Sequence, residues 1–329
     1  MAYEKILTDY PKLKAARAYT AERLELIRKA LADKLEPSDY KGKITIVAVG
    51  SYGRGEASSA SDLDLYILFD SDRDAEDAIP AELVAVEKVV DQYVPNSTGE
   101  TGTFGSRACV RFADILSKIG GTEDTNYHIT RRLLFLLEGT WLYGEGRFQQ
   151  YRRELLNCYI KETDTDGRLS RFLLNDIIRY YRTITTDFEH KVSAQQQGWG
   201  LRQVKLRFSR KILYFGGIVA VAETTGLPIT DKLEKIGDWF DCQGLERIYQ
   251  AAPNQPETRQ VLELYEYFLA VISEPRTREQ LKVLQKENRA QCQRYNELRE
   301  KGIELSETLA GWLKSKYTAD HEIHHALIF

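Results

Sequence analysis

The hydrophobic pattern of the first half of the chain is set by two apolar runs with a polar turn between them. Residues 44–49 are mostly β-branched or apolar, and residues 63–69 have a similar composition. Such runs are typical of buried strands. Segments 11–35 and 81–93 instead carry apolar residues at every third or fourth position, which predicts two helices that pack against the strands.

Strand and helix patterns continue to alternate as far as about residue 148. A loop rich in Gly, Thr and Ser at 95–106 leads into a predicted strand at 107–112, and a helical pattern follows at 126–139. The loop either closes over a ligand or only joins its neighbours. Arg131 and Arg132 lie on the polar side of that helix, where a solvated basic turn and a phosphate contact are the two alternatives.

From residue 149 onward the apolar spacing is helical throughout. The predicted helices are 168–191, 199–222, 257–272 and a long polar helix from 276. We therefore expect an α+β fold class. A mixed sheet with flanking helices would form a domain of residues 1–148, and an all-helical bundle would form a second domain of residues 149–329.

Composition narrows the class of protein. The 329 residues are 43% hydrophobic, enough for two sizeable cores. A net charge of −3 argues against a generic polyanion binder. The four cysteines are far apart in sequence, which argues against a disulfide framework or zinc ribbon and for a reducing compartment. No apolar run approaches membrane-spanning length and the first residues resemble no signal peptide, so we expect a soluble, cytoplasmic protein.

The polar turn after the first apolar run combines glycines with hydrogen-bond donors. Gly50, Gly53 and Gly55 fall within six residues, so the backbone can turn sharply and approach a ligand closely. Backbone amides in such a turn can form an anion-binding concavity. Ser51 and Arg54 lie between these glycines and would add a hydroxyl and a guanidinium, the donors that phosphate oxygens require.

Two carboxylates follow this turn at the start of the second apolar run. Asp62 and Asp64 are two residues apart, and side chains two apart on a strand project from the same face. Adjacent carboxylates repel each other, and divalent cations would relieve that repulsion. Mg²⁺ prefers a few carboxylates together with substrate phosphate oxygens. A phosphate-binding turn beside a carboxylate pair suits phosphoryl or nucleotidyl transfer.

These residues together resemble a known signature. Gly50-Ser51, Gly53-Arg54 and Ser61-Asp62-Leu63-Asp64 are similar to the motif of the polymerase-β nucleotidyltransferase superfamily. The nearest branch contains the uridylyltransferases that modify PII signalling proteins and related adenylyltransferases. The resemblance implies a nucleoside triphosphate as substrate, two Mg²⁺ ions at Asp62 and Asp64, and a triphosphate held by Gly50, Ser51, Gly53 and Arg54.

The superfamily also supplies a third carboxylate from a later strand, as a metal ligand or base. Asp114, which follows the predicted strand 107–112, is the candidate for this catalytic and metal-binding position. Glu123 and Asp124 are rivals. Both rivals also suit the first turn of the next helix, where acidic residues favour the helix dipole without any catalytic role.

The helical domain offers weaker candidates for substrate binding. Several nucleotidyltransferases hold the β- and γ-phosphates with a lysine and a hydroxyl on a helix of the second domain, and Lys205 and Ser209 are similar in kind. Arg171, Arg179 and Arg182 share one arc of the helix 168–191. This arc is either a solvated face with ion pairs or a positive surface that faces the triphosphate or the acceptor.

The resemblance implies transfer of a nucleoside monophosphate to an acceptor hydroxyl with release of pyrophosphate. A protein side chain is the favoured acceptor, with an RNA 3′ end, a small molecule or a second nucleotide as alternatives. A catalytically weak nucleotide-binding regulator is an alternative of another class. The chain is too short for the hydrolase and ligand-sensing domains of the PII-modifying enzymes. Its residues do not indicate the base of the nucleotide or the oligomeric state.

The C-terminal segment holds the one histidine cluster of the chain. His321, Glu322 and His325 have the spacing of a zinc-protease motif, but no third ligand is evident. We expect instead a tail that docks on the helical bundle.

Overall fold

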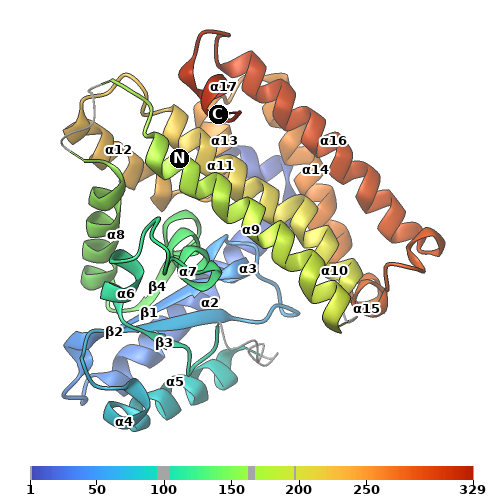
Figure 1. Cartoon of the computed structure of the whole chain (residues 1–329). Coiled ribbons are helices and arrows are strands. Elements are labelled where there is room, and N and C mark those ends of the chain that lie inside the picture. The colour runs from blue at the N-terminus through green and yellow to red at the C-terminus, as the bar shows by residue number, and fades with distance from the viewer. Residues whose placement is uncertain (1, 95–103, 162–166, 196–197, 329) are drawn as a thin grey trace. The chain divides into compact units, whose positions relative to one another are not determined.

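The computed structural model describes residues 2–94, 104–161, 167–195 and 198–328 (Figure 1). The chain folds into two compact units. One unit is Ala15–Lys161, and the other combines Met1–Lys14 with Glu162–Phe329. The predicted domain boundary near residue 148 falls within helix α8 (Glu145–Tyr159), which belongs to the first unit. The division into a catalytic and a substrate-binding domain stays a prediction. The predicted loop 95–106 lies largely outside the described residues.

The first unit is built on a four-stranded mixed sheet in the order β3-β2-β1-β4. Strands β1 (Ile44–Val49) and β2 (Asp64–Phe69) are antiparallel, with Val49 opposite Asp64. Strand β4 (Thr140–Tyr143) is antiparallel to β1, and β3 (Cys109–Val110) is parallel to β2. The helices of this unit are α2 (Pro11–Leu35), α3 (Gly50–Gly53), α4 (Ala75–Ala78), α5 (Pro80–Tyr93), α6 (Phe112–Leu116), α7 (Asn126–Leu137) and α8.

Helices cover both faces of this sheet, and its central strands β1 and β2 are buried except for the half-buried Asp64. Alternate residues of β1 and β2 enter a core cluster with apolar residues of α2 and α5, among them Ile27, Leu31 and Val86. The intervening residues of β2 face the other way, where α7 places Arg131 over the ring of Tyr66. Asp64 shares the Tyr66 face, since side chains two apart in a strand point the same way.

The strand predicted at 107–112 is shorter than expected. Strand β3 ends at Val110, and helix α6 begins at Phe112. Asp114 lies in the first turn of α6 and forms an ion pair with Arg111, the N-cap residue. An acidic group in this position favours the helix dipole, so Phe112 and Asp114 belong to a helix instead of a strand end.

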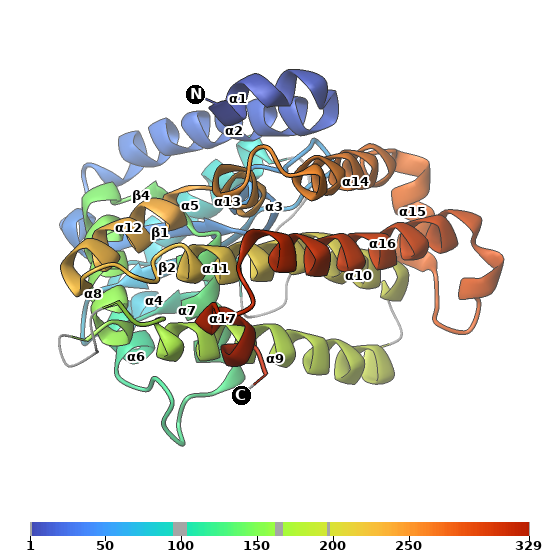
Figure 2. The ribbon, with the colours of Figure 1, turned by 90° about the horizontal axis from the view of Figure 1, so that it is seen from above.

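The second unit is helical throughout its described residues. Its helices are α1 (Ala2–Ile6), α9 (Arg171–Gln195), α10 (Trp199–Lys205), α11 (Lys211–Ala222), α12 (Ile229–Asp241), α13 (Gly244–Ala251), α14 (Pro256–Ile272), α15 (Pro275–Val283), α16 (Gln293–Lys316) and α17 (Glu322–Ala326). In both ribbon views the long helices α9, α11, α14 and α16 run roughly along one direction (Figure 1, Figure 2).

Two predicted helices of this unit are interrupted. A π-helical turn, Leu206–Arg210, separates α10 from α11. The long polar helix expected from residue 276 is also two helices, α15 and α16. Its break follows from Leu284, whose backbone turns extended and whose carbonyl accepts a hydrogen bond from Gly200 N at 3.2 Å. Leu284 thereby packs against the glycine of another helix.

The C-terminal tail docks as expected. Ile323 is fully buried, and Glu322 accepts hydrogen bonds from Arg168 and from the backbone N–H of Leu169. His321 Nδ1 accepts from Ile323 N and so caps α17. The described residues contain no cluster of three or more metal-ligating side chains, at this tail or elsewhere.

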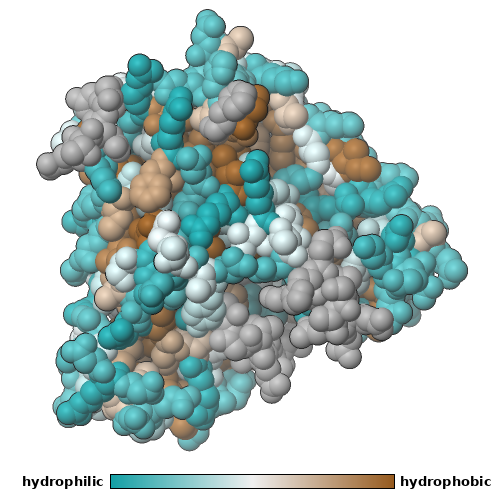
Figure 3. All heavy atoms as spheres, in the orientation of Figure 1, coloured by the Kyte–Doolittle hydropathy of each residue, from teal (hydrophilic) through white to brown (hydrophobic). Residues whose placement is uncertain are grey.

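None of the described helices is long and apolar enough to cross a membrane. Hydrophilic side chains dominate the face of the molecule seen in Figure 3, and apolar ones form small groups between them.

Close packing between α11 and α13 supports a stability prediction. A Cβ at Gly216 would lie 2.9 Å from the Cα of Gly244, whereas nothing lies within 4 Å of a Cβ at Gly237 in α12. We expect Gly216→Ala to lower the free energy of unfolding by about 1–3 kcal/mol through overpacking. Gly237→Ala should raise it by up to about 1 kcal/mol through helix propensity. Urea denaturation of both variants checks the opposite signs.

Candidate functional site

The glycine turn lies directly beside the start of β2. Gly50 has a φ of +70°, in the left-handed region, and opens the short helix α3 at the end of β1. A Cβ on Gly50 would lie 2.6 Å from Oδ2 of Asp64. Gly53 is equally constrained, because a Cβ there would overlap the backbone carbonyl of Glu138. Glycine is therefore required at Gly50 by both conformation and close packing, and at Gly53 by close packing.

The structure brings Asp62 and Asp64 to this turn. Both are half-buried, while Ser61, Leu63 and Leu65 around them are buried, as alternation along an extended chain requires. Asp64 packs on Gly50. Asp62 lies near α3, since its charge adds to the effect of burial in raising the pKa of Tyr52. Ser51, next to Gly50 in α3, is also half-buried.

A buried carboxylate that the sequence did not indicate holds the turn in place. Glu138 follows α7, and its side chain has no exposed surface. Its Oε1 accepts a hydrogen bond of 2.7 Å from Gly50 N, and its Oε2 accepts one of 2.6 Å from Arg54. The only sequence signal is a charged residue directly after the apolar run Leu133–Leu137.

Arg54 is engaged by carboxylates on two sides. Besides the bond to Glu138, its Nε donates to Glu56 at 2.9 Å. The guanidinium is nearly buried, with 8% of its side chain exposed. At least two of its three nitrogens therefore bind within the protein, and the charge of Arg54 is balanced before any phosphate arrives.

Asp114 is not brought to this site. Strand β3 runs parallel to β2, with Val110 opposite Leu68, so Asp114 lies beyond the end of β2 opposite to Asp64. Leu68 is four positions along β2 from Asp64, which is about 13 Å. Arg111, the partner of Asp114, also lies 3.8 Å from Asp72, which follows β2. The geometry does not support Asp114 as a third ligand beside Asp62 and Asp64.

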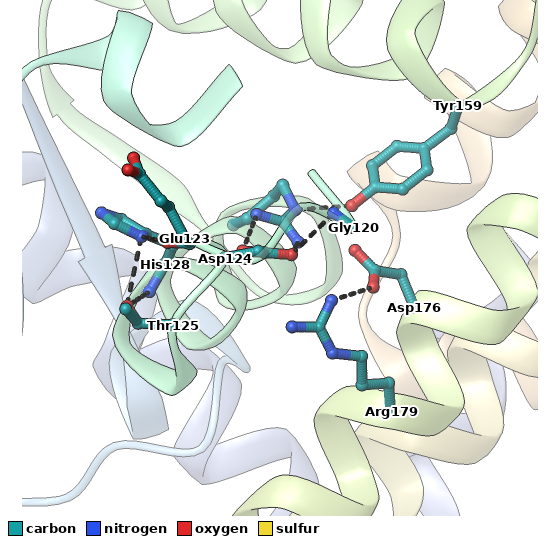
Figure 4. Close-up of polar contacts among 9 residues, drawn as sticks. Gly120, Glu123, Asp124, Thr125, His128, Tyr159, Asp176 and Arg179 are labelled. Atoms are coloured by element: carbon teal, nitrogen blue, oxygen red, sulfur yellow. Dashed lines mark hydrogen bonds and ion pairs between the residues drawn. The ribbon is translucent and has the colours of Figure 1, made fainter. Parts of the chain in front are cut away.

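The two rival carboxylates, Asp124 and Glu123, bind basic residues elsewhere in the first unit (Figure 4). Asp124 is buried and binds Arg132 through two hydrogen bonds of 2.9 and 3.1 Å. It also accepts from Gly120 N, and Arg132 donates to the hydroxyl of Tyr159 at 2.6 Å. Asp124 thus ties the loop before α7 to α8. Glu123 is exposed, with an ion pair of 3.6 Å to Lys118.

Of the two alternatives for Arg131-Arg132, the solvated basic turn is wrong. Both side chains are fully buried. Arg132 is neutralised by Asp124. The guanidinium of Arg131 stacks on Tyr127 at 3.8 Å, and burial lowers the pKa of Arg131.

Of the two candidates of the helical unit, Lys205 directly precedes the π-helical turn and Ser209 lies within it. Lys205 is the last residue of α10 and is half-buried. Ser209 lies within the turn, is 3% exposed, and shares a hydrogen bond of 3.1 Å with the hydroxyl of Tyr265. Ser209 therefore points into the helical core, and its hydroxyl already has a partner.

The arginine arc of α9 is partly neutralised. Arg179 forms an ion pair of 3.3 Å with Asp176, a buried residue of the same helix (Figure 4). Arg171 and Arg182 are exposed. The arc thus combines both alternatives, an ion pair at its centre and exposed cations at its ends.

A metal ion at this turn would have two carboxylates as protein ligands. Asp62 and Asp64 share one face beside the turn, and the described residues hold no larger cluster of ligating side chains. Such a pair fits Mg²⁺, which takes one or two carboxylates and completes its shell with water and substrate phosphate.

Residues 24–119 match the family model of a nucleotidyltransferase domain. The matched segment begins in α2, contains the glycine turn and both aspartates, and ends after α6. The chain carries a nucleotidyltransferase domain. This match and the mixed sheet assign the domain to the polymerase-β-like superfamily. No curated protein matches the chain. Glu138 lies outside the matched segment, so this nucleotidyltransferase completes its turn with a residue beyond it.

Gly50 allows a direct test of the turn. We expect Gly50→Ala to lower the free energy of unfolding by about 1–2 kcal/mol, because alanine is strained at positive φ, and to displace the carboxylate of Asp64. Gly42→Ala is the matched control, since no atom lies within 4 Å of its added Cβ and its φ is not positive. Equal urea denaturation curves for the two variants would contradict the geometry.

Glu138 allows a second test. Glu138→Gln should lower the free energy of unfolding by about 3 kcal/mol, as expected when a buried ion pair loses one partner. Glu123→Gln, which changes an exposed ion pair, should alter stability by less than about 1 kcal/mol. Chemical denaturation measures both. A difference between them within experimental error would show that Glu138 does not hold the turn.

Proposed function

We propose that this nucleotidyltransferase is Mg²⁺-dependent and moves a nucleoside monophosphate from a nucleoside triphosphate to an acceptor hydroxyl. The observation that supports this most directly is the packing of the Asp64 carboxylate on Gly50. It puts a metal-binding group beside the turn that would receive the triphosphate. Pyrophosphate is the leaving group of such a transfer.

Each residue of the turn has a distinct task in this proposal. Asp62 and Asp64 hold the metal, and Ser51 adds a hydroxyl donor toward the triphosphate. Gly50 and Gly53 keep the backbone close to both. Bound Mg²⁺ would lower the pKa of the acceptor hydroxyl and stabilise the charge that develops on the phosphates.

Arg54 and Glu138 act through the turn instead of contacting the phosphates. Arg54 joins Glu138 and Glu56, and Glu138 fixes the backbone N–H of Gly50. Transfer reactions of this kind depend on donors that are in place before the charge develops. A buried ion pair on the turn supplies that rigidity.

A protein side chain is the acceptor we propose. An RNA 3′ end is the second candidate, because Arg171 and Arg182 leave exposed positive charge on α9. Binding of RNA through such charges would weaken steeply as salt increases, whereas modification of a protein hydroxyl need not. Small-molecule acceptors and a weakly active nucleotide-binding regulator are the other outcomes of the assay below.

The carboxylate pair is tested by substitution. Asp62→Asn combined with Asp64→Asn should reduce pyrophosphate release by at least a thousandfold, because the metal loses both protein ligands. Asp114→Asn should retain activity close to that of the unchanged protein, since Asp114 lies at the other end of the sheet. Circular dichroism confirms that each variant is folded. Full activity in the double variant would refute the proposed mechanism.

The acceptor is identified in the same assay. The protein is incubated with Mg²⁺ and each of ATP, GTP, CTP and UTP labelled at the α-phosphate, with cell extract as the acceptor source. Mass spectrometry then shows which molecule carries the label. Nucleotide binding with no labelled product from any of the four would favour the regulator.

A further inference from the structure

Lys211 is a half-buried cation in the helical unit that no carboxylate neutralises. It begins α11, and its Nζ donates to the hydroxyl of Ser306 and, at 3.4 Å, to the carbonyl of Gly302, both on α16. Among the described residues it has no ion pair. Lysine is rarely buried unless it is paired, so these two neutral acceptors leave its charge uncompensated.

A second cation stands one turn before Lys211. Arg207 belongs to the π-helical turn, and its aliphatic carbons pack against Gly302, where a Cβ would lie 3.2 Å from Arg207 Cβ. Its Nε is buried and has no hydrogen-bond partner among the described atoms. Its guanidinium forms a hydrogen bond with the hydroxyl of Tyr295 of α16, and both this bond and its charge oppose the rise in pKa that burial gives Tyr295. π-Helical turns inside α-helices occur frequently at functional sites.

An aromatic pair and a third cation complete the surroundings. Tyr181 of α9 stacks on Tyr214 of α11, with ring centroids 4.4 Å apart and ring planes at 11°. The positive charge of Arg207 acts on Tyr181, and that of Arg182 acts on Tyr214. Among the described residues, the groups that act on Lys211, Tyr181 and Tyr214 are thus cationic or neutral.

The positive charges also affect one another. Burial, with a smaller contribution from Arg207, lowers the pKa of Lys211 to about 8. The repulsion persists because helices α9, α11 and α16 hold these side chains in place. An anion between them would relieve both the repulsion and the desolvation of the ammonium group.

We propose that Lys211 and Arg207 form an oxyanion-binding site in the helical unit and that it takes a phosphate group. An ammonium and a guanidinium side by side offer charge-assisted hydrogen bonds to several oxygens at once. The buried Nε of Arg207 supplies an orphaned donor for one of them. This site does not depend on the carboxylate pair of the nucleotidyltransferase domain, and it stands whether or not that domain uses Mg²⁺.

The first test uses sulfate, whose charge does not change between neutral and alkaline pH. Sulfate is titrated into the full chain without metal by calorimetry at about pH 7 and about pH 9.5. Lys211 carries its charge below its pKa of about 8 and loses it above, so affinity should fall by roughly tenfold or more over this range. The pKa values of Tyr181, Tyr214 and Tyr295 are raised by burial, and guanidinium groups do not titrate here.

Variants assign this effect to the site. Lys211→Gln and Arg207→Gln should each weaken sulfate binding at neutral pH by roughly tenfold or more. Lys211→Gln should also remove the pH dependence. Lys314→Gln changes an exposed lysine of α16 and should leave both unchanged. The Asp62→Asn/Asp64→Asn variant should bind sulfate normally, which separates this site from the proposed catalysis.

A competition experiment identifies the source of the phosphate group. Metal-free ATP that displaces sulfate from the unchanged protein, but binds weakly to Lys211→Gln, would indicate the nucleotide's own phosphates. Displacement by inorganic phosphate without displacement by ATP would indicate a small anion. Sulfate affinity that is equal at both pH values, or equal in Lys211→Gln and Lys314→Gln, overturns the proposal. The comparison of pH values in the unchanged protein stands even where a variant fails to fold.

Discussion

The nucleotidyltransferase turn depends on one buried carboxylate, that of Glu138. Its two oxygens bind the backbone N–H of Gly50 and the guanidinium of Arg54, so it fixes the first residue and the centre of the turn together. The backbone of Glu138 packs on Gly53 as well. Because the site is held by this contact, the carboxylate of Asp64 meets Gly50 at one defined position on the sheet.

The parts of the site that the sequence predicts are those encoded locally. Strands β1 and β2, the glycine turn and the common face of Asp62 and Asp64 all follow from side-chain period and glycine spacing within about 25 residues of chain. Helices α2 and α5 follow from their apolar stripes. The nucleotidyltransferase resemblance rested on the same short segment, which lies inside the matched residues 24–119.

What the sequence did not predict depends on contacts between distant residues. Glu138 is 88 residues from Gly50, and nothing in its local pattern marks its partner. Arg132 had a solvated turn and a phosphate contact as its alternatives, but it pairs with Asp124 inside the unit. Asp114 was expected directly after a strand, although Arg111 caps a helix there. Lys205 and Ser209 were expected on one helix, but Ser209 lies in a π-helical turn and its hydroxyl bonds Tyr265.

Buried and half-buried cations are compensated in different ways along the chain. Arg54 and Arg132 in the first unit each face a buried carboxylate, so their desolvation is offset within the fold. In the helical unit, Lys211 donates to a carbonyl and a hydroxyl and lies near Arg207, which forms a hydrogen bond with Tyr295. Packing alone gives no reason to keep two cations together without a counter-charge, since apolar residues of similar size would be more stable there. The lack of a counter-charge among the described residues supports the proposed oxyanion site, because a bound anion would balance the two cations.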